Sequence, residues 1–166
     1  VSTISDKSLF FTDKFPQNFL YIALIFTLFP TAKVVHTKRN PKAVCWSNFK
    51  HYFSVNGLGY SYQLADTVLY FELYQNLMDF WENLYGDRIF HLDYELLTVN
   101  QEDETRRLLK YLDINWENNC LHPHKNNRPV RTASKQQVKA QVYSGSSNMW
   151  LKFKPFLNGA LDNLQS

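Results

Sequence analysis

The stretch Lys33–Pro41, KVVHTKRNP, decides how this chain is expected to fold. Its β-branched first half predicts a short strand over 32–37, buried on both faces. Asn40 and Pro41 then suit the cap and the first position of a helix that we expect to run to about Phe53. Arg39 lies between the two elements, where parallel sheets present side chains to ligands.

The rest of the chain alternates further helices with one more strand. Apolar residues at helical spacing predict a long helix over 62–85, ended by Gly86, and shorter helices over 16–29, over 100–112 and from about 148. A second strand is expected over 88–93, and residues 113–147 are expected to be irregular. Strands separated by helices of ten or more residues imply a parallel sheet, so the expected class is α/β, with a short sheet flanked by helices. Two strands are few for an open sheet, which favours a domain that extends outside this sequence.

Composition narrows the class of protein. The 166 residues suit one compact domain, and contents of 45% apolar and 16% aromatic residues exclude a disordered chain. The net charge of +3 comes from scattered Lys and Arg rather than from a basic stripe, which argues against a nucleic-acid partner. The apolar run over 19–29 is too short to span a bilayer, and two cysteines are too few for a disulfide framework. We therefore expect a cytoplasmic protein without a membrane span.

Arg39 and Ser47 are candidates for holding a phosphate group. Arg39 falls at the carboxyl end of the expected strand, and its fork of donors suits two-point contact with phosphate oxygens. Ser47 lies about two turns into the following helix and can donate a further hydrogen bond. Taken alone, the pair fits a surface ion pair and an ordinary helical serine at least as well.

Three further features are polar or aromatic where a nucleotide would need them, although no glycine-rich phosphate loop accompanies them. Tyr94 follows the second strand and can stack on an adenine ring, with a core aromatic as the ordinary alternative. Lys14 precedes the first helix and either stabilises developing negative charge or is a solvated surface lysine. The segment over 132–139 either folds over a nucleotide or forms an ordinary turn. Its candidate contacts are Thr132, Ser134, Gln137 and Lys139.

In combination, these features resemble the sulfotransferase family. The likeness is strongest to the bacterial branch often fused to tetratricopeptide repeats, which is related to the tyrosylprotein sulfotransferases. It is specific in order and spacing and spans nearly the whole chain. The segments that carry it are Thr12–Phe19, Phe29–His36, Arg39–Pro41 with Ser47, Tyr94–Glu95, Trp116–Leu121, Thr132–Val138 and Trp150.

The resemblance implies a fold and a reaction. Members of the family have a three-layer fold like that of P-loop NTPases, which this chain would form in part. They transfer a sulfuryl group from 3′-phosphoadenylyl sulfate (PAPS) to a hydroxyl or amine, mainly by in-line positioning and charge stabilisation, without a metal.

The resemblance also assigns roles to the candidate residues. By motif, Arg39 and Ser47 would hold the 3′-phosphate and Tyr94 the adenine. Lys14 and Ser134 would stabilise the bridging oxygen, and the loop over 134–143 would close over the nucleotide. Upstream tetratricopeptide repeats are an implied partner, and the acceptor (tyrosine, sugar, lipid or small alcohol) stays open.

The chain departs from the family pattern in several places. It has no counterpart of the first strand and glycine-containing loop that cradle the 5′-phosphosulfate, nor of the usual general base upstream of Lys14. Where the tyrosylprotein branch has an arginine one turn after Ser47, this chain has His51, and Asn40 replaces the aspartate of Arg-Asp-Pro. We therefore expect residues 1–166 to be the C-terminal portion of a sulfotransferase domain. It would keep the 3′-phosphate half of the site and, in isolation, show weak or undetectable transfer.

Other functions fit parts of the same pattern. A non-catalytic nucleotide-binding module would have the same pocket without the chemistry. A nucleic-acid binder would need an exposed stacking platform, whereas the aromatic residues here favour core helix faces. A zinc protein would need three or four convergent ligands, and short ligand-like spacings often arise by chance. Those spacings are Cys120, His122 and His124 in one segment and His91, Asp93 and Glu95 in another.

Overall fold

The computed structural model describes residues 10–53, 57–126 and 141–165. Two strands, β1 (Val34–Lys38) and β2 (Ile89–Asp93), pair in parallel, with Val34 opposite Ile89 and Lys38 opposite Asp93. The chain between them forms helices α2 (Pro41–Phe49) and α3 (Leu64–Tyr85), as a parallel connection requires. The predicted α/β class, with a short parallel sheet flanked by helices, is confirmed.

The remaining elements are helical. They are the 3₁₀ turn η1 (Pro16–Tyr21), helix α1 (Ile22–Leu28), the 3₁₀ turns η2 (Gly59–Tyr62) and η3 (Gly86–Arg88), helices α4 (Tyr94–Val99) and α5 (Gln101–Leu112), and the 3₁₀ segments η4 (Asn118–Leu121), η5 (Pro123–Lys125) and η6 (Ser146–Phe156). None of the helices in the described ranges combines the length and the apolar character needed to cross a bilayer.

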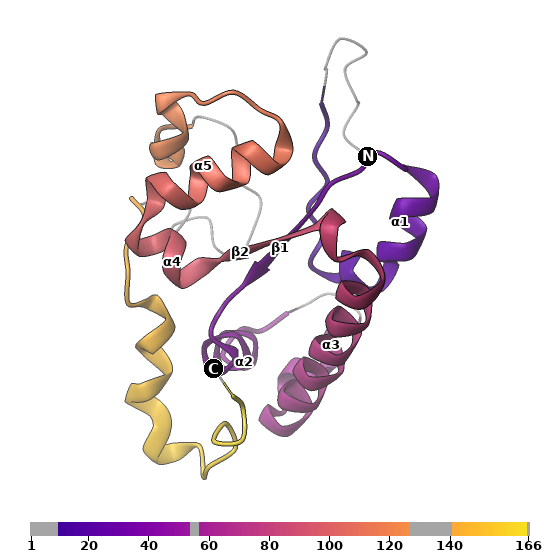
Figure 1. Ribbon diagram of the computed structural model, residues 1–166. Helices are drawn as coiled ribbons and strands as arrows, with labels where there is room; N and C mark the ends of the chain where they lie inside the picture. Colours follow the sequence, from indigo (N-terminus) through magenta and orange to yellow (C-terminus); the bar gives the residue numbers. More distant parts are fainter. Residues whose placement is uncertain (1–9, 54–56, 127–140, 166) are drawn as a thin grey trace.

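Helices lie on opposite sides of the two strands, with α1 and α3 on one side and α4 and α5 on the other (Figure 1). On the first side, Ile89 is buried in a cluster with Ile22 and Phe26 of α1 and Met78 of α3. On the second side, Phe90 of β2 stacks on Tyr111 of α5, with ring centroids 5.1 Å apart. The sheet is therefore the middle of three layers.

The expectation that the first strand is buried on both faces is wrong. Val35 is 38% exposed, and Thr37 is also exposed. Among the described residues, α5 packs against β2 and not squarely over β1, which leaves Val35 and Thr37 exposed.

A second cluster joins α2 to α3 and η6. Its buried members are Ala43, Cys45, Phe71, Trp150, Leu161 and Leu164. Trp150 packs among residues of α2 and α3, although it lies far along the chain from both. This packing returns the C-terminal segment to the carboxyl end of β1, where the candidate site lies.

Side-chain capping accounts for the start of α2 but not for every helix end. The Asn40 side chain accepts from the backbone N–H of Ala43 at 3.1 Å, which confirms the predicted cap of α2. The helix ends at Phe49 and not near Phe53. Asn100 occupies the N-cap position of α5 as predicted, but its side chain makes no capping hydrogen bond.

Candidate functional site

Arg39 follows β1 directly, and three side chains hold its guanidinium in place. Its Nε donates to the Ser147 hydroxyl at 2.9 Å and its Nη2 donates to the Ser146 hydroxyl at 3.2 Å. The guanidinium also lies 4.7 Å from the centre of the Tyr94 ring, and the Tyr94 hydroxyl is 3.0 Å from that of Ser146. The structure thus brings together two sequence-predicted residues, Arg39 and Tyr94, which are 55 positions apart.

The two serines were not among the sequence-predicted residues. Ser146 and Ser147 begin η6, directly after Gly145, whose φ of 88° is a left-handed conformation that glycine adopts without strain. Ser147 is buried, and its hydroxyl oxygen faces the Arg39 guanidinium. The paired serines after a glycine were the available signal, but nothing local in the sequence connects them to Arg39.

The start of α2 is held by Glu95 of α4, the helix that directly follows β2. Its Oε1 accepts from the backbone N–H of Asn40 at 3.3 Å. Glu95 thus anchors a backbone group at the point where the chain leaves the sheet. The contact ties the segment that carries Arg39 to the start of α4.

A cleft of about 1000 Å³ opens beside this end of the sheet. Lys14 and Arg39 both line it, so two of the residues predicted to meet a nucleotide share one cavity. Its wall also carries Lys38 and three carboxylates. The cationic side chains give this concave, partly apolar cavity donors for an anionic group on a ligand with an organic body. The carboxylates are Asp79, Asp93 and Glu95.

Ser47 is half-buried on α2 and does not itself line the cleft. It lies one turn after Val44 and next to Asn48, which do line it. Its backbone carbonyl accepts from His51 Nδ1 at 2.8 Å, so the His51 ring is turned back to the end of its own helix. The structure therefore places His51 in a capping role, and places Ser47 at the border of the cleft.

Four predicted residues, Thr132, Ser134, Gln137 and Lys139, lie outside the described residues, as does the rest of the segment over 132–139. Their predicted roles stay predictions.

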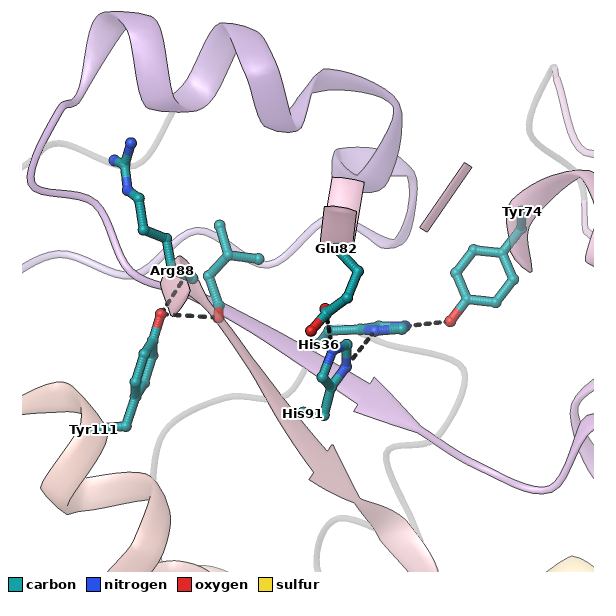
Figure 2. Close-up of polar contacts among 7 residues, drawn as sticks. His36, Tyr74, Glu82, Arg88, His91 and Tyr111 are labelled. Atoms are coloured by element: carbon teal, nitrogen blue, oxygen red, sulfur yellow. Dashed lines mark hydrogen bonds and ion pairs between the residues drawn. The ribbon is translucent and has the colours of Figure 1, made fainter. Parts of the chain in front are cut away.

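A chain of polar side chains crosses the cleft face of the sheet. His36 Nδ1 and His91 Nδ1 are 3.0 Å apart, His36 Nε2 contacts the Tyr74 hydroxyl, and His91 Nε2 contacts a Glu82 carboxylate oxygen (Figure 2). Burial lowers the pKa of His36 to about 4, helped by the nearby His91 and Lys38. Burial also raises the pKa of Tyr74 to about 12. From the sequence, His91 was a candidate only for a zinc ligand, and no local pattern connects it to His36.

The ligand-like spacings do not converge on a metal. Across the described ranges, no three or more His, Cys, Asp or Glu side chains form a group that could hold an ion. His91 instead contacts Glu82, and Asp93 accepts from the backbone N–H of Leu96 at 2.8 Å as the cap of α4. Cys45 is fully buried, which raises the pKa of its thiol to about 12 and leaves it a core residue.

Fold and site together define an α/β protein with an arginine-bearing cleft at the carboxyl end of a parallel sheet. The family model described as "Sulfotransferase family" matches residues 2–118. The chain belongs to the sulfotransferase family, as its sequence pattern indicated.

An uncharacterized protein of Aquifex aeolicus (strain VF5) is 35% identical to the chain over 155 residues, which are 92% of this chain. The aligned part is 20% of that protein's length, so the chain spans about one fifth of this relative.

Proposed function

We propose that this chain supplies the 3′-phosphate half of a PAPS site, and that the protein to which it belongs transfers a sulfuryl group from PAPS to a hydroxyl acceptor. The observation that supports this most directly is the guanidinium of Arg39, which lines the cleft and is held by Ser146, Ser147 and Tyr94. Membership of the sulfotransferase family supports the reaction class.

Each role follows from what the side chain can donate. Arg39 binds the 3′-phosphate with the guanidinium donors that the serines leave free, and hydroxyls beside it can rotate to donate as well. Ser47 adds a hydrogen bond from the neighbouring turn of α2. Tyr94 meets the adenine, and Lys14 stabilises charge on the bridging oxygen as the sulfuryl group leaves. Ser134 assists Lys14 at that oxygen.

Three residues of the segment over 132–139 complete the proposed donor site. Thr132, Gln137 and Lys139 contact the nucleotide from a loop that folds over it. No metal has a role in this scheme, because lysine and arginine supply the positive charge.

The experiment is a calorimetric titration of the chain with adenosine 3′,5′-bisphosphate and, separately, with adenosine 5′-monophosphate. We expect the bisphosphate to bind more tightly, because only it carries the 3′-phosphate. Arg39→Ala should weaken bisphosphate binding about 10- to 100-fold, as expected for the loss of charge-assisted hydrogen bonds, and leave the monophosphate nearly unaffected.

A matched control is Arg106→Ala. Arg106 pairs with Glu102 at 2.7 Å and stacks on Trp116 on the surface of α5, outside the cleft. Its loss removes the same charge without touching the site, so bisphosphate affinity should stay within about twofold. Equal affinity for the two nucleotides, or equal effects of the two substitutions, would contradict the proposal.

A further inference from the structure

The outward face of helix α3 carries a row of five large apolar side chains that a single copy of the chain leaves largely in contact with water. Four of them are between 52% and 58% exposed, and the fifth, Leu77, is half-buried. Figure 1 shows α3 at the outer edge of the molecule. Because the other side of α3 packs on the core, the helix is apolar on two sides, which is typical of a helix covered on both. The four exposed members of the row are Leu69, Leu73, Phe80 and Leu84.

The row is continuous and carries no charge. At 3.6 residues per turn, its members fall within an arc of about 80° and extend over about 23 Å of the helix. The acidic residues of α3 lie elsewhere. Asp79 lines the cleft, Glu82 contacts His91, Asp66 precedes the row, and Glu72 is turned about 100° from its middle. The face therefore offers apolar contact but no charged group by which a basic or an acidic partner would be selected.

The spacing of the row is symmetric about its own middle. When two copies of α3 lie antiparallel with a two-fold axis beside Leu77, Leu69 faces Leu84 of the second copy and Leu73 faces Phe80 of the second copy. A two-fold contact requires that each residue of a facing pair meet the other in both copies, and this row satisfies the requirement with apolar residues throughout. The row is thus complementary to itself.

We propose that this face joins two copies of the chain through an antiparallel pair of α3 helices. Half-exposed side chains of this size contribute on the order of 100 Å² each, so the row supplies on the order of 1000 Å² over two copies. Tyr70 and Trp81, which are half-buried beside the row, add to this area. The total is close to the lower limit for a specific interface, so we expect a reversible dimer with a Kd in the micromolar range.

The dimer leaves both clefts open. The side chains with which α3 lines the cleft include Phe71, Tyr74 and Met78, which belong to or pack against the two core clusters. The row lies on roughly the opposite side of the helix. Association through the row therefore does not cover Arg39, and the dimer is independent of the proposed nucleotide site.

The first experiment is sedimentation velocity of the unaltered chain over about 1–200 µM, in which the sedimentation coefficient should rise from that of a monomer to that of a dimer. Leu73→Glu places a carboxylate opposite the Phe80 ring and should weaken association at least about 100-fold. Val99→Glu is the matched control, because Val99 is 71% exposed on α4, on the other side of the sheet. A chain that stays monomeric at every concentration, or equal effects of the two substitutions, would overturn the proposal.

A mixing experiment tests the antiparallel register. Phe80→Lys should abolish the dimer by itself, as Leu73→Glu does. In a mixture of the two variants the introduced carboxylate faces the introduced ammonium, and the second pair, Phe80 with Leu73, stays intact, so a heterodimer should form. Both positions are exposed in one copy, so each variant should keep the circular-dichroism spectrum of the unaltered chain. Folded variants that remain monomeric when mixed would refute this register.

Nucleotide binding separates this inference from the proposed function. Leu73→Glu should bind adenosine 3′,5′-bisphosphate within about twofold of the unaltered chain, because distant sites act independently. An unaltered chain that dimerises but binds no bisphosphate would contradict only the proposed function. An unaltered chain that binds bisphosphate but stays monomeric would contradict only the dimer.

Discussion

At the scale of single residues, the imidazole of His36 is the group most altered by its surroundings. Burial beside Tyr74 of α3, with His91 next to it on β2 and Lys38 two residues away on β1, brings its pKa from 6.5 to about 4. Glu82 opposes this in part. The folded chain therefore keeps His36 neutral at pH values at which the unfolded chain would protonate it.

This difference makes stability depend on pH. Above pH 6.5 His36 is neutral in both states, and its contribution to stability is fully present. As the pH falls from 6.5 toward 4, only the unfolded state gains the proton, so the free energy of unfolding should fall. At about 1.4 kcal/mol for each tenfold step in proton affinity, the loss is on the order of 3 kcal/mol at most. Urea unfolding at pH 7.5, 6, 5 and 4.5 measures it.

The control for this prediction is His36→Gln, which keeps a polar side chain but cannot titrate. Its free energy of unfolding should change less between pH 6.5 and 4.5 than that of the unaltered chain. The same slope in both proteins would mean that other groups, and not His36, set the pH dependence.

At the scale of elements, two helices that begin with asparagine differ in how they are capped. The Asn40 side chain accepts from Ala43 N–H at the start of α2, whereas the Asn100 side chain makes no such bond at the start of α5. Asn40→Ala should therefore lower the free energy of unfolding by ~1 kcal/mol, because a backbone donor loses its partner. Asn100→Ala should cost only a few tenths of that. Chemical denaturation of both variants measures the difference, and equal losses would contradict it.

How far elements could be predicted depended on how local their determinants were. Apolar residues at helical spacing predicted α3 to within two residues of its observed bounds, Leu64–Tyr85. Helix α4 was missed, because it follows β2 without a glycine or proline to mark the boundary. Asp93, which caps it by accepting from Leu96 N–H, was the overlooked signal.

The site was only partly predictable, because only some of its residues are close together in the sequence. Arg39 was placed correctly at the end of β1, because the strand and the capped helix around it are adjacent in the sequence. Its partners Ser146 and Ser147 are 107 and 108 positions away. Contacts between residues so far apart are set by the packing of the whole chain, which no local pattern in the sequence encodes.

At the scale of the whole molecule, the packing of η6 on α2 determines where those serines lie. Trp150 is 7% exposed and sits in the cluster with Ala43, Cys45 and Phe71, only a few residues after Ser146 and Ser147. An intact core and an organised site therefore depend on the same buried ring.

This coupling predicts that Trp150→Ala affects stability and binding together. Truncating so large a buried side chain should cost about 3–5 kcal/mol in the free energy of unfolding. Because η6 then loses its anchor, bisphosphate affinity should also fall, even in the fraction of molecules that stays folded at low temperature. Phe156→Ala is the control, since Phe156 ends the same segment but is 77% exposed, and it should change neither quantity appreciably. Folded Trp150→Ala protein that binds bisphosphate with unaltered affinity would show that Arg39 needs no support from η6, because its free guanidinium alone would then hold the phosphate.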